Sequence, residues 1–168
     1  VGYVQAAAEL DAQLEAQGLE VDWVALAGAN MTPAGMALGL KALGRQVRIL
    51  NIAPIKWSED RAVDIARIGN AAADLLAIET RLEPTDVENH DEYIGPRYGV
   101  VTDGCREALR LVAGTEGLIL DPVYSGKAMA GLIDQIRKGH IRKGERVVYV
   151  HTGGMPALFA YAGDLGLA

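Results

Sequence analysis

Apolar residues along the chain recur either at helical spacing or in short continuous runs, and the two patterns alternate. Helical spacing, together with good helix formers and glycine stops, predicts helices in 2–18, the second part of 29–44, 58–78, 103–117, 126–139 and 155–163. Continuous apolar runs, typical of short buried strands, cover 21–28, 46–54, 118–122 and 145–154. The stretch 84–100 is polar and loop-rich, and we expect a short strand in it near Val87.

Strands that are apolar along their whole length indicate a parallel sheet buried on both faces. Because helices separate these strands, the sequence predicts an α/β fold with three layers, α-β-α, around a mainly parallel sheet. The chain has no internal repeat, low-complexity tract or linker, so we expect residues 1–168 to form a single α/β domain. The chain starts at Val1 inside a helical pattern, and we expect it to be the C-terminal portion of a longer protein.

Three loops are expected to leave strand ends, at 28–33, 121–126 and 151–155, and ligands of such sheets bind at the carboxyl ends of the strands. The first loop leads into a helix N-terminus, which offers free backbone N–H groups to an anion such as phosphate. It is neither G-x-G-x-x-G nor a loop with a Walker lysine. The alternative is an ordinary turn in which Thr32 caps the helix and Pro33 is its first residue.

The other two loops have both structural and functional interpretations. In "DPVYSG" (121–126), Ser125 could cap the next helix and Tyr124 could pack its ring on the sheet end. In "HTGGMPAL" (151–158), the glycines permit close approach of a ligand or simply make a turn before a helix. His151 is expected to be a hydrogen-bonded residue at a strand end. Tyr98, between Pro96 and Gly99, lies either on the surface or in a cleft where its phenol could carry a proton.

The composition narrows the classes of partner. Half of the 168 residues are hydrophobic, and the formal net charge of −6 disfavours binding to nucleic acid or to an anionic membrane. No apolar run approaches the roughly 18–20 residues of a membrane span, and the N-terminus does not have the pattern of a signal peptide. Cys105 is the only cysteine and the three histidines are far apart, so we expect no disulfide framework and no metal site, in a cytoplasmic protein.

Three motifs in this order carry a resemblance to a known family: "GPRYG" (95–99), "LDPVYSGKA" (120–128) and "HTGGMPAL" (151–158). With them the chain resembles the C-terminal half of the aminocyclopropane-carboxylate deaminase and D-cysteine desulfhydrase family, most strongly between Tyr93 and Tyr161. These are pyridoxal-phosphate enzymes of the tryptophan-synthase β-subunit fold type (fold type II). The resemblance therefore implies the large domain of that fold, pyridoxal 5'-phosphate as the cofactor, a small amino acid as the substrate and a homodimer.

The resemblance also implies roles for individual residues. Tyr124 and Tyr98 match two active-site tyrosines and are the catalytic candidates. The loop 28–32 matches the family's phosphate-binding loop, although Pro33 replaces a glutamine and has no N–H to donate. The residues expected to bind the cofactor are Gly28, Ala29, Asn30, Met31, Thr32, Ser125 and Thr152.

Ser125 distinguishes two reactions within this family, because it matches the residue that faces the pyridine nitrogen. A carboxylate there would keep the nitrogen protonated and make the ring a strong electron sink, whereas a neutral hydroxyl would not. The resemblance associates glutamate at this position with opening of the aminocyclopropane ring, and serine or threonine with β-elimination. Ser125 therefore favours α,β-elimination of a small, sulfur-containing amino acid, with release of ammonia; aminocyclopropane-carboxylate deamination is the alternative.

The lysine that binds the cofactor covalently in this fold type lies upstream of the region that this chain resembles. Lys127 is the nearest candidate, but the resemblance places it beside the cofactor. We therefore expect this chain alone to be inactive. The unusual "NMTP" sequence (30–33) leaves open a third hypothesis for the function: the protein could be a non-catalytic member of the family that binds a phosphorylated small molecule.

Overall fold

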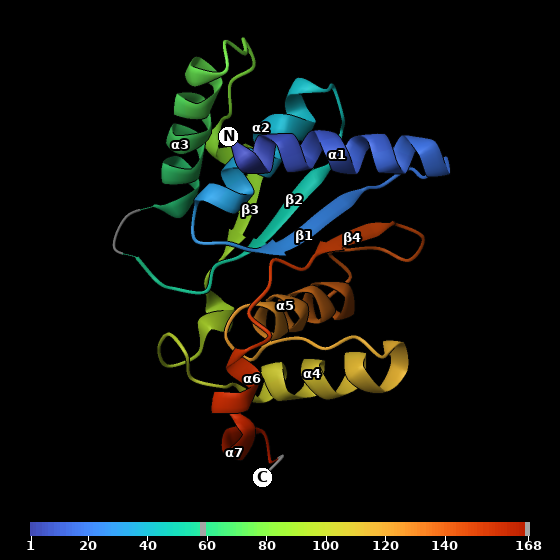
Figure 1. The fold of residues 1–168 in the computed structure, drawn as a ribbon, viewed down its shortest axis with the longest axis vertical. Helices are drawn as coiled ribbons and strands as arrows, with labels where there is room; N and C mark the ends of the chain where they lie inside the picture. Colours follow the sequence, from blue (N-terminus) through green and yellow to red (C-terminus); the bar gives the residue numbers. More distant parts are fainter. Residues whose placement is uncertain (58–59, 167–168) are drawn as a thin grey trace.

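The structure is a computed structural model that describes residues 1–57 and 60–166. Its elements alternate between helices and strands over most of the chain (Figure 1). In chain order they are α1 (Gly2–Gln17), β1 (Trp23–Ala27), α2 (Met31–Ala42), β2 (Arg48–Ile52), α3 (Arg61–Leu75), the 3₁₀ helix η1 (Pro84–Asp86), β3 (Val87–His90), the 3₁₀ helix η2 (Glu92–Ile94), α4 (Asp103–Glu116), α5 (Ser125–Arg137), β4 (Val147–Val150), α6 (Ala157–Ala160) and α7 (Ala162–Leu165).

The strands form one parallel sheet with the order β3-β2-β1-β4. From β1 the chain moves outward through β2 to β3, and it then returns to add β4 on the other side of β1. The direction of strand addition thus reverses between β1 and β4, which is the topological switch point at which open α/β sheets bind ligands. The predicted strand near Val87 and the parallel sheet are both confirmed.

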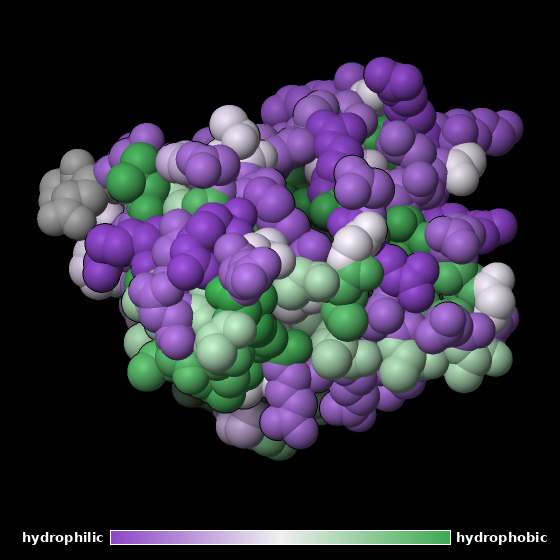
Figure 2. Space-filling view, turned by 90° about the horizontal axis from the view of Figure 1, so that it is seen from above, coloured by the Kyte–Doolittle hydropathy of each residue, from purple (hydrophilic) through white to green (hydrophobic). Residues whose placement is uncertain are grey.

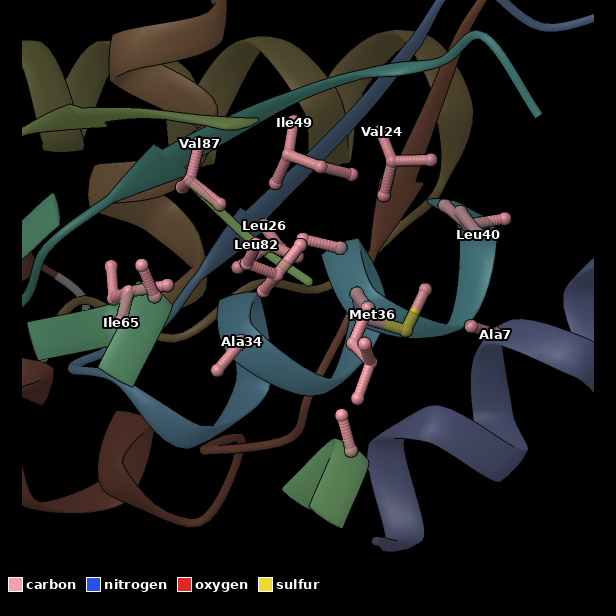
Figure 3. Packing of buried hydrophobic residues seen from close by; sticks show 14 residues of the cluster. Ala7, Val24, Leu26, Ala34, Met36, Leu40, Ile49, Ile65, Leu82 and Val87 are labelled. Atoms are coloured by element: carbon pink, nitrogen blue, oxygen red, sulfur yellow. The ribbon is translucent and has the colours of Figure 1, made fainter. Parts of the chain in front are cut away.

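Helices cover both faces of the sheet, so the predicted α-β-α layering is confirmed (Figure 1). α2 and α3 pack on one face with α1 outside α2, and α5 packs on the other face with α4 outside it. Alternate β1 residues enter opposite cores: Val24 and Leu26 face α2, whereas Trp23 and Ala25 face α5. Figure 3 shows the α2-side core, where Leu26, Ile49 and Met36 converge between sheet and helices. Burial on both faces explains why the central strands β1 and β2 are almost continuously apolar in the sequence.

Local sequence signals fix several helix ends. The Asp60 side chain accepts the N–H of Ala62 at 2.9 Å and caps α3, and Thr102 accepts the N–H of Cys105 at 3.2 Å and caps α4. Gly117 ends α4 in the left-handed conformation, with φ 68°. The predicted helix 58–78 begins at Arg61 in the structure, and residues 58–59 of that prediction lie outside the described residues.

Three local predictions were wrong. Segment 118–122 is not a strand, because it pairs with no strand of the sheet and Leu118 and Ile119 are 57% and 47% exposed. Thr32 does not cap α2; Asn30 holds that position, which puts Pro33 in the third helical position. The last helix is divided into α6 and α7 by a break at Tyr161.

The surface over α1, α2 and α3 is mostly hydrophilic, with hydrophobic residues gathered toward one edge (Figure 2). None of the helices in the described ranges is both long enough and apolar enough to cross a bilayer. Within the same ranges, no group of three or more His, Cys, Asp or Glu side chains is arranged to hold a metal ion.

Candidate active site

The loops that follow β1 and β4 meet at the topological switch point. β1 and β4 are parallel neighbours with Leu26 opposite Val150, so the chain leaves both strands at the same edge of the sheet. Loop 28–30 leads directly into α2, and loop 151–156 leads into α6. Two of the three predicted site loops are therefore side by side because of the strand order.

The third loop, 121–124, reaches this place without a strand of its own. The Tyr149 hydroxyl on β4 donates to the Ser125 carbonyl oxygen at 2.7 Å. A ring nitrogen of His151 lies 3.1 Å from the Ile119 carbonyl oxygen. At Gly154, with φ 96°, a Cβ atom would lie 2.5 Å from the Asp121 carboxylate. Contacts from β4 and its loop thus hold the turn that precedes α5.

Asp121 organises that turn, and its role was missed in the sequence. The side chain is fully buried, and Oδ1 accepts the backbone N–H groups of Val123 at 2.7 Å and Tyr124 at 2.8 Å. Oδ2 accepts the Ser125 N–H at 2.8 Å and the Ser125 hydroxyl at 2.6 Å. Four donors fill the roughly four acceptor sites of a carboxylate. An aspartate followed four residues later by serine, just before a helix, was the available signal.

Ser125 is the first residue of α5, not its cap, which is Tyr124. Its hydroxyl accepts the Asp121 N–H at 2.7 Å and donates its hydrogen to the Asp121 carboxylate. The residue is 1% exposed. Ser125 is therefore a neutral oxygen whose hydrogen is already used, with one lone pair left for another partner.

Tyr98 and Tyr124 are brought together from segments that are 26 residues apart. Their hydroxyls are hydrogen-bonded, and their rings meet edge to face, with centroids 6.0 Å apart. The hydrogen bond with Tyr124, together with burial, raises the pKa of Tyr98 to about 12. Whichever phenol accepts within the pair has its own hydrogen free for a ligand.

The N-terminus of α2 has the properties of an anion site. The N–H groups of Met31 and Thr32 belong to the first turn and have no acceptor within the helix. Thr32 is half-buried, so its hydroxyl can join them. Gly28 is packed so tightly that a Cβ atom would clash with the ring of Pro33. Free N–H groups, a positive dipole end and close backbone approach fit a phosphate group.

Asn51 supports this loop from the neighbouring strand β2 and was also missed in the sequence. Its amide nitrogen donates to the Gly28 carbonyl oxygen at 2.9 Å and to Asn89 Oδ1 at 2.7 Å. The side chain is fully buried, and its Oδ1 atom has no partner among the described residues. A polar residue inside an apolar strand was the available signal. Asn51 fixes the peptide at which β1 turns into the loop.

The remaining predicted residues are more peripheral. Ala29 and Asn30 are half-buried, and the Asn30 amide lies 3.4 Å from Asp64 Oδ2. Met31 is 70% exposed and Thr152 is exposed. The loops place all of these residues around the switch point. His151 accepts the Gly153 N–H at 3.1 Å through Nδ1, so both ring nitrogens have backbone partners.

The Lys127 side chain contacts a different segment, the end of η2. It is 1% exposed, and its ammonium donates to the Ile94 carbonyl oxygen at 2.5 Å. Burial lowers its pKa. This placement agrees with the expectation that Lys127 is not the lysine that binds a cofactor covalently.

Comparisons with known proteins agree with this arrangement. Residues 1–153 match the family described as "Pyridoxal-phosphate dependent enzyme". The chain is 39% identical over 163 residues to a 1-aminocyclopropane-1-carboxylate deaminase from Burkholderia ambifaria (strain MC40-6), covering 96% of this chain and 48% of the relative. A protein of the same name from Burkholderia vietnamiensis (strain G4 / LMG 22486) is 40% identical over 163 residues, covering 96% of this chain and 47% of that protein.

Solved structures show the same similarity. A crystal structure described as an ACC deaminase homologue superposes with a TM-score of 0.85 at 35% identity, covering 99% of this chain and 49% of that one. O-ureido-L-serine synthase, at 18% identity and a TM-score of 0.56, shares the fold, with coverage of 96% of this chain and 48% of that one. The chain spans about half the length of the curated relatives that it matches, and corresponds to their C-terminal half.

Proposed function

Because the chain belongs to the family of pyridoxal-phosphate-dependent enzymes, we propose that the protein is a lyase that removes ammonia from a small amino acid by α,β-elimination. The substrate in this proposal carries sulfur at its β-carbon, as in a D-cysteine desulfhydrase. The observation that carries the proposal is Ser125, a neutral hydroxyl at the position where the resemblance expects contact with the pyridine nitrogen. A cytoplasmic homodimer, expected from the resemblance and composition, is part of the same proposal.

The residues of the α2 N-terminus would hold the cofactor through its phosphate. The free N–H groups of Met31 and Thr32 and the Thr32 hydroxyl supply donors, and the clash that any side chain at Gly28 would cause shows how closely the loop packs. Pro33 contributes no N–H group, so the donor set is smaller than an ordinary first turn would provide. When bound, pyridoxal phosphate supplies an electron sink for the bonds at the substrate's α-carbon.

The tyrosine pair would act on the substrate as a proton donor. Since the pKa of Tyr98 is raised to about 12, its phenol is protonated at neutral pH and is a poor base. The free hydrogen of the pair can orient the substrate or protonate a leaving group. The base that removes the α-proton is assigned to an upstream lysine, as the resemblance implies.

Ser125 supports elimination because the neighbouring carboxylate of Asp121 cannot replace it as the partner of the pyridine nitrogen. All acceptor sites of the Asp121 carboxylate are filled from within the turn, so no carboxylate oxygen is free for a ring nitrogen. What the turn offers is the neutral hydroxyl of Ser125, which can rotate its hydrogen from the Asp121 carboxylate toward an unprotonated ring nitrogen. A weaker electron sink suffices for a substrate with a good β-leaving group, whereas ring opening has no such group to expel.

A second candidate, 1-aminocyclopropane-1-carboxylate deaminase, is favoured by the names of relatives about 40% identical to this chain. The full-length protein, purified with its cofactor, distinguishes the two reactions. The proposal expects sulfide and pyruvate from D-cysteine, and little α-ketobutyrate from aminocyclopropane carboxylate. The opposite ratio would select the second candidate, and the lack of visible absorbance from a bound cofactor would contradict both.

A matched variant tests the observation itself. Ser125→Glu should shift the ratio of the two activities toward ring opening, because a carboxylate would then face the ring nitrogen. Ser125→Thr keeps a neutral hydroxyl and serves as the control, with an unchanged ratio. Equal ratios in all three proteins would remove Ser125 as the basis of the proposal.

A further inference from the structure

Lys127 is a buried cation that the proposed reaction does not use. It is the third residue of α5 and 1% exposed. The described part of the chain contains no carboxylate ion-paired with it. Its ammonium group donates to the Ile94 carbonyl oxygen, 2.5 Å from Nζ. Burying an amine in the first turn of a helix, near the positive end of the dipole, is unfavourable, so this contact calls for an explanation.

The Ile94 carbonyl lies at the base of the loop that carries Tyr98. Ile94 is the last residue of η2, and Gly95 then turns the chain with φ 80°. A Cβ atom at Gly95 would lie 2.5 Å from the methyl group of Thr102, which caps α4. The base of loop 95–100 is thus contacted by both Lys127 and Thr102.

The tip of the same loop is held by the same turn of α5. Tyr98 hydrogen-bonds to Tyr124, which directly precedes α5 and lies three residues before Lys127. The helix start therefore holds the loop at two points, by an ammonium at its base and a phenol at its tip. If the base moved, the position of the Tyr98 hydroxyl relative to that of Tyr124 would change with it.

We infer that Lys127 is a positioning residue: by holding the Ile94 carbonyl it fixes loop 95–100 so that the Tyr98 hydroxyl meets that of Tyr124. Only the role of the two tyrosines in catalysis rests on the proposed function. The positioning itself follows from the contacts of Lys127 and can be tested in the absence of cofactor and substrate.

Nitration of tyrosines by tetranitromethane provides the readout, because the reagent attacks the phenolate. In the full-length protein, the nitration rate of each tyrosine at mildly alkaline pH is followed by peptide mass spectrometry. Tyr98 should react slowly while it is hydrogen-bonded to Tyr124, because the pKa of Tyr98 is raised to about 12. A return toward the ordinary tyrosine value of about 10 would increase its phenolate fraction up to about 100-fold.

Lys127→Met keeps a side chain of similar length and removes the donor. We expect it to raise the nitration rate of Tyr98 at least about tenfold, as Tyr124→Phe should do directly. The double variant should react no faster than Tyr124→Phe, because both changes remove the same contact. Tyr3, on the distant helix α1, is the internal reference, and Lys41→Met, at an exposed ion pair, is the control variant.

Three outcomes decide the inference. A selective rise at Tyr98 that is not additive with Tyr124→Phe supports it. A Tyr98 rate in Lys127→Met within about twofold of wild type, while Tyr124→Phe reacts faster, overturns it. If Tyr3 also accelerates, Lys127→Met has lost its fold, and Lys127→Leu, which also removes the donor, is judged by the same ratio. Because this experiment measures no activity, a negative result would reject the positioning role of Lys127 without affecting the proposed reaction. Rejection of the proposed reaction would likewise leave the positioning role untouched.

Discussion

Replacing Asp121 by asparagine tests whether its carboxylate holds the turn before α5. Asparagine has nearly the same shape, so packing against Gly154 is preserved while half of the acceptor capacity is lost. Its single oxygen can still accept the N–H groups of Val123 and Tyr124. Its amide nitrogen, however, would face the N–H of Ser125, a donor opposite a donor.

The expected cost follows from these contacts. Leaving the buried Ser125 N–H without an acceptor costs about 1–3 kcal/mol, and turning two charge-assisted bonds into neutral ones costs roughly 1 kcal/mol each. Part of this sum is offset because a neutral amide is easier to bury than a carboxylate. We expect a net loss of about 3 kcal/mol in the free energy of unfolding, which is about a hundredfold in the unfolding equilibrium.

Urea denaturation, followed by circular dichroism, measures this loss as a lower midpoint with an unchanged slope. Asp103→Asn is the control, because that carboxylate is fully exposed and bonded to Arg106, and it should leave the midpoint nearly unchanged. If the two variants lose similar stability, the carboxylate of Asp121 does not organise the turn and the reasoning above is refuted.

Three further predictions concern other parts of the fold. In α5, Gly131→Ala would put a Cβ atom 2.5 Å from a β2 side chain and should cost about 1–3 kcal/mol, whereas Gly114→Ala, with no atom within 4 Å, should stabilise α4 by roughly 0.5–1 kcal/mol in the same urea assay. Burial, and then a hydrogen bond to Asp134, raise the pKa of Tyr93 to about 12. The protonated Tyr93 phenol therefore stabilises the fold fully below about pH 10, which is its pKa in the unfolded chain, and this contribution is lost as the pH rises through its pKa in the folded state. Tyr93→Phe should therefore reduce the fall in the free energy of unfolding at alkaline pH. Thr32→Val should weaken binding of pyridoxal phosphate several-fold, about 1 kcal/mol, without affecting pyridoxal, which has no phosphate; equal effects on both ligands in a titration would contradict a phosphate contact.

The periodicity of the sequence was sufficient for most elements because the helices and strands are locally consistent. Apolar runs at 21–28 and 46–54 contain β1 and β2, and glycines mark the ends of α1 and α4. The same reasoning failed at 118–122. That run is apolar enough for a strand, but a strand exists only if a neighbour supplies the hydrogen-bond ladder.

The amino-acid sequence by itself determined the α/β class, the alternation of elements, and the motifs that identify the family. It could do so because burial patterns and turn residues are properties of short segments. The tertiary structure alone decided which loops meet, since strand order is a long-range property and places β4 beside β1. It also decided that Tyr98 meets Tyr124 and that Lys127 is buried against a carbonyl. The sequence around a residue does not indicate which distant residue it will contact, so contacts between segments are seen only in the folded chain.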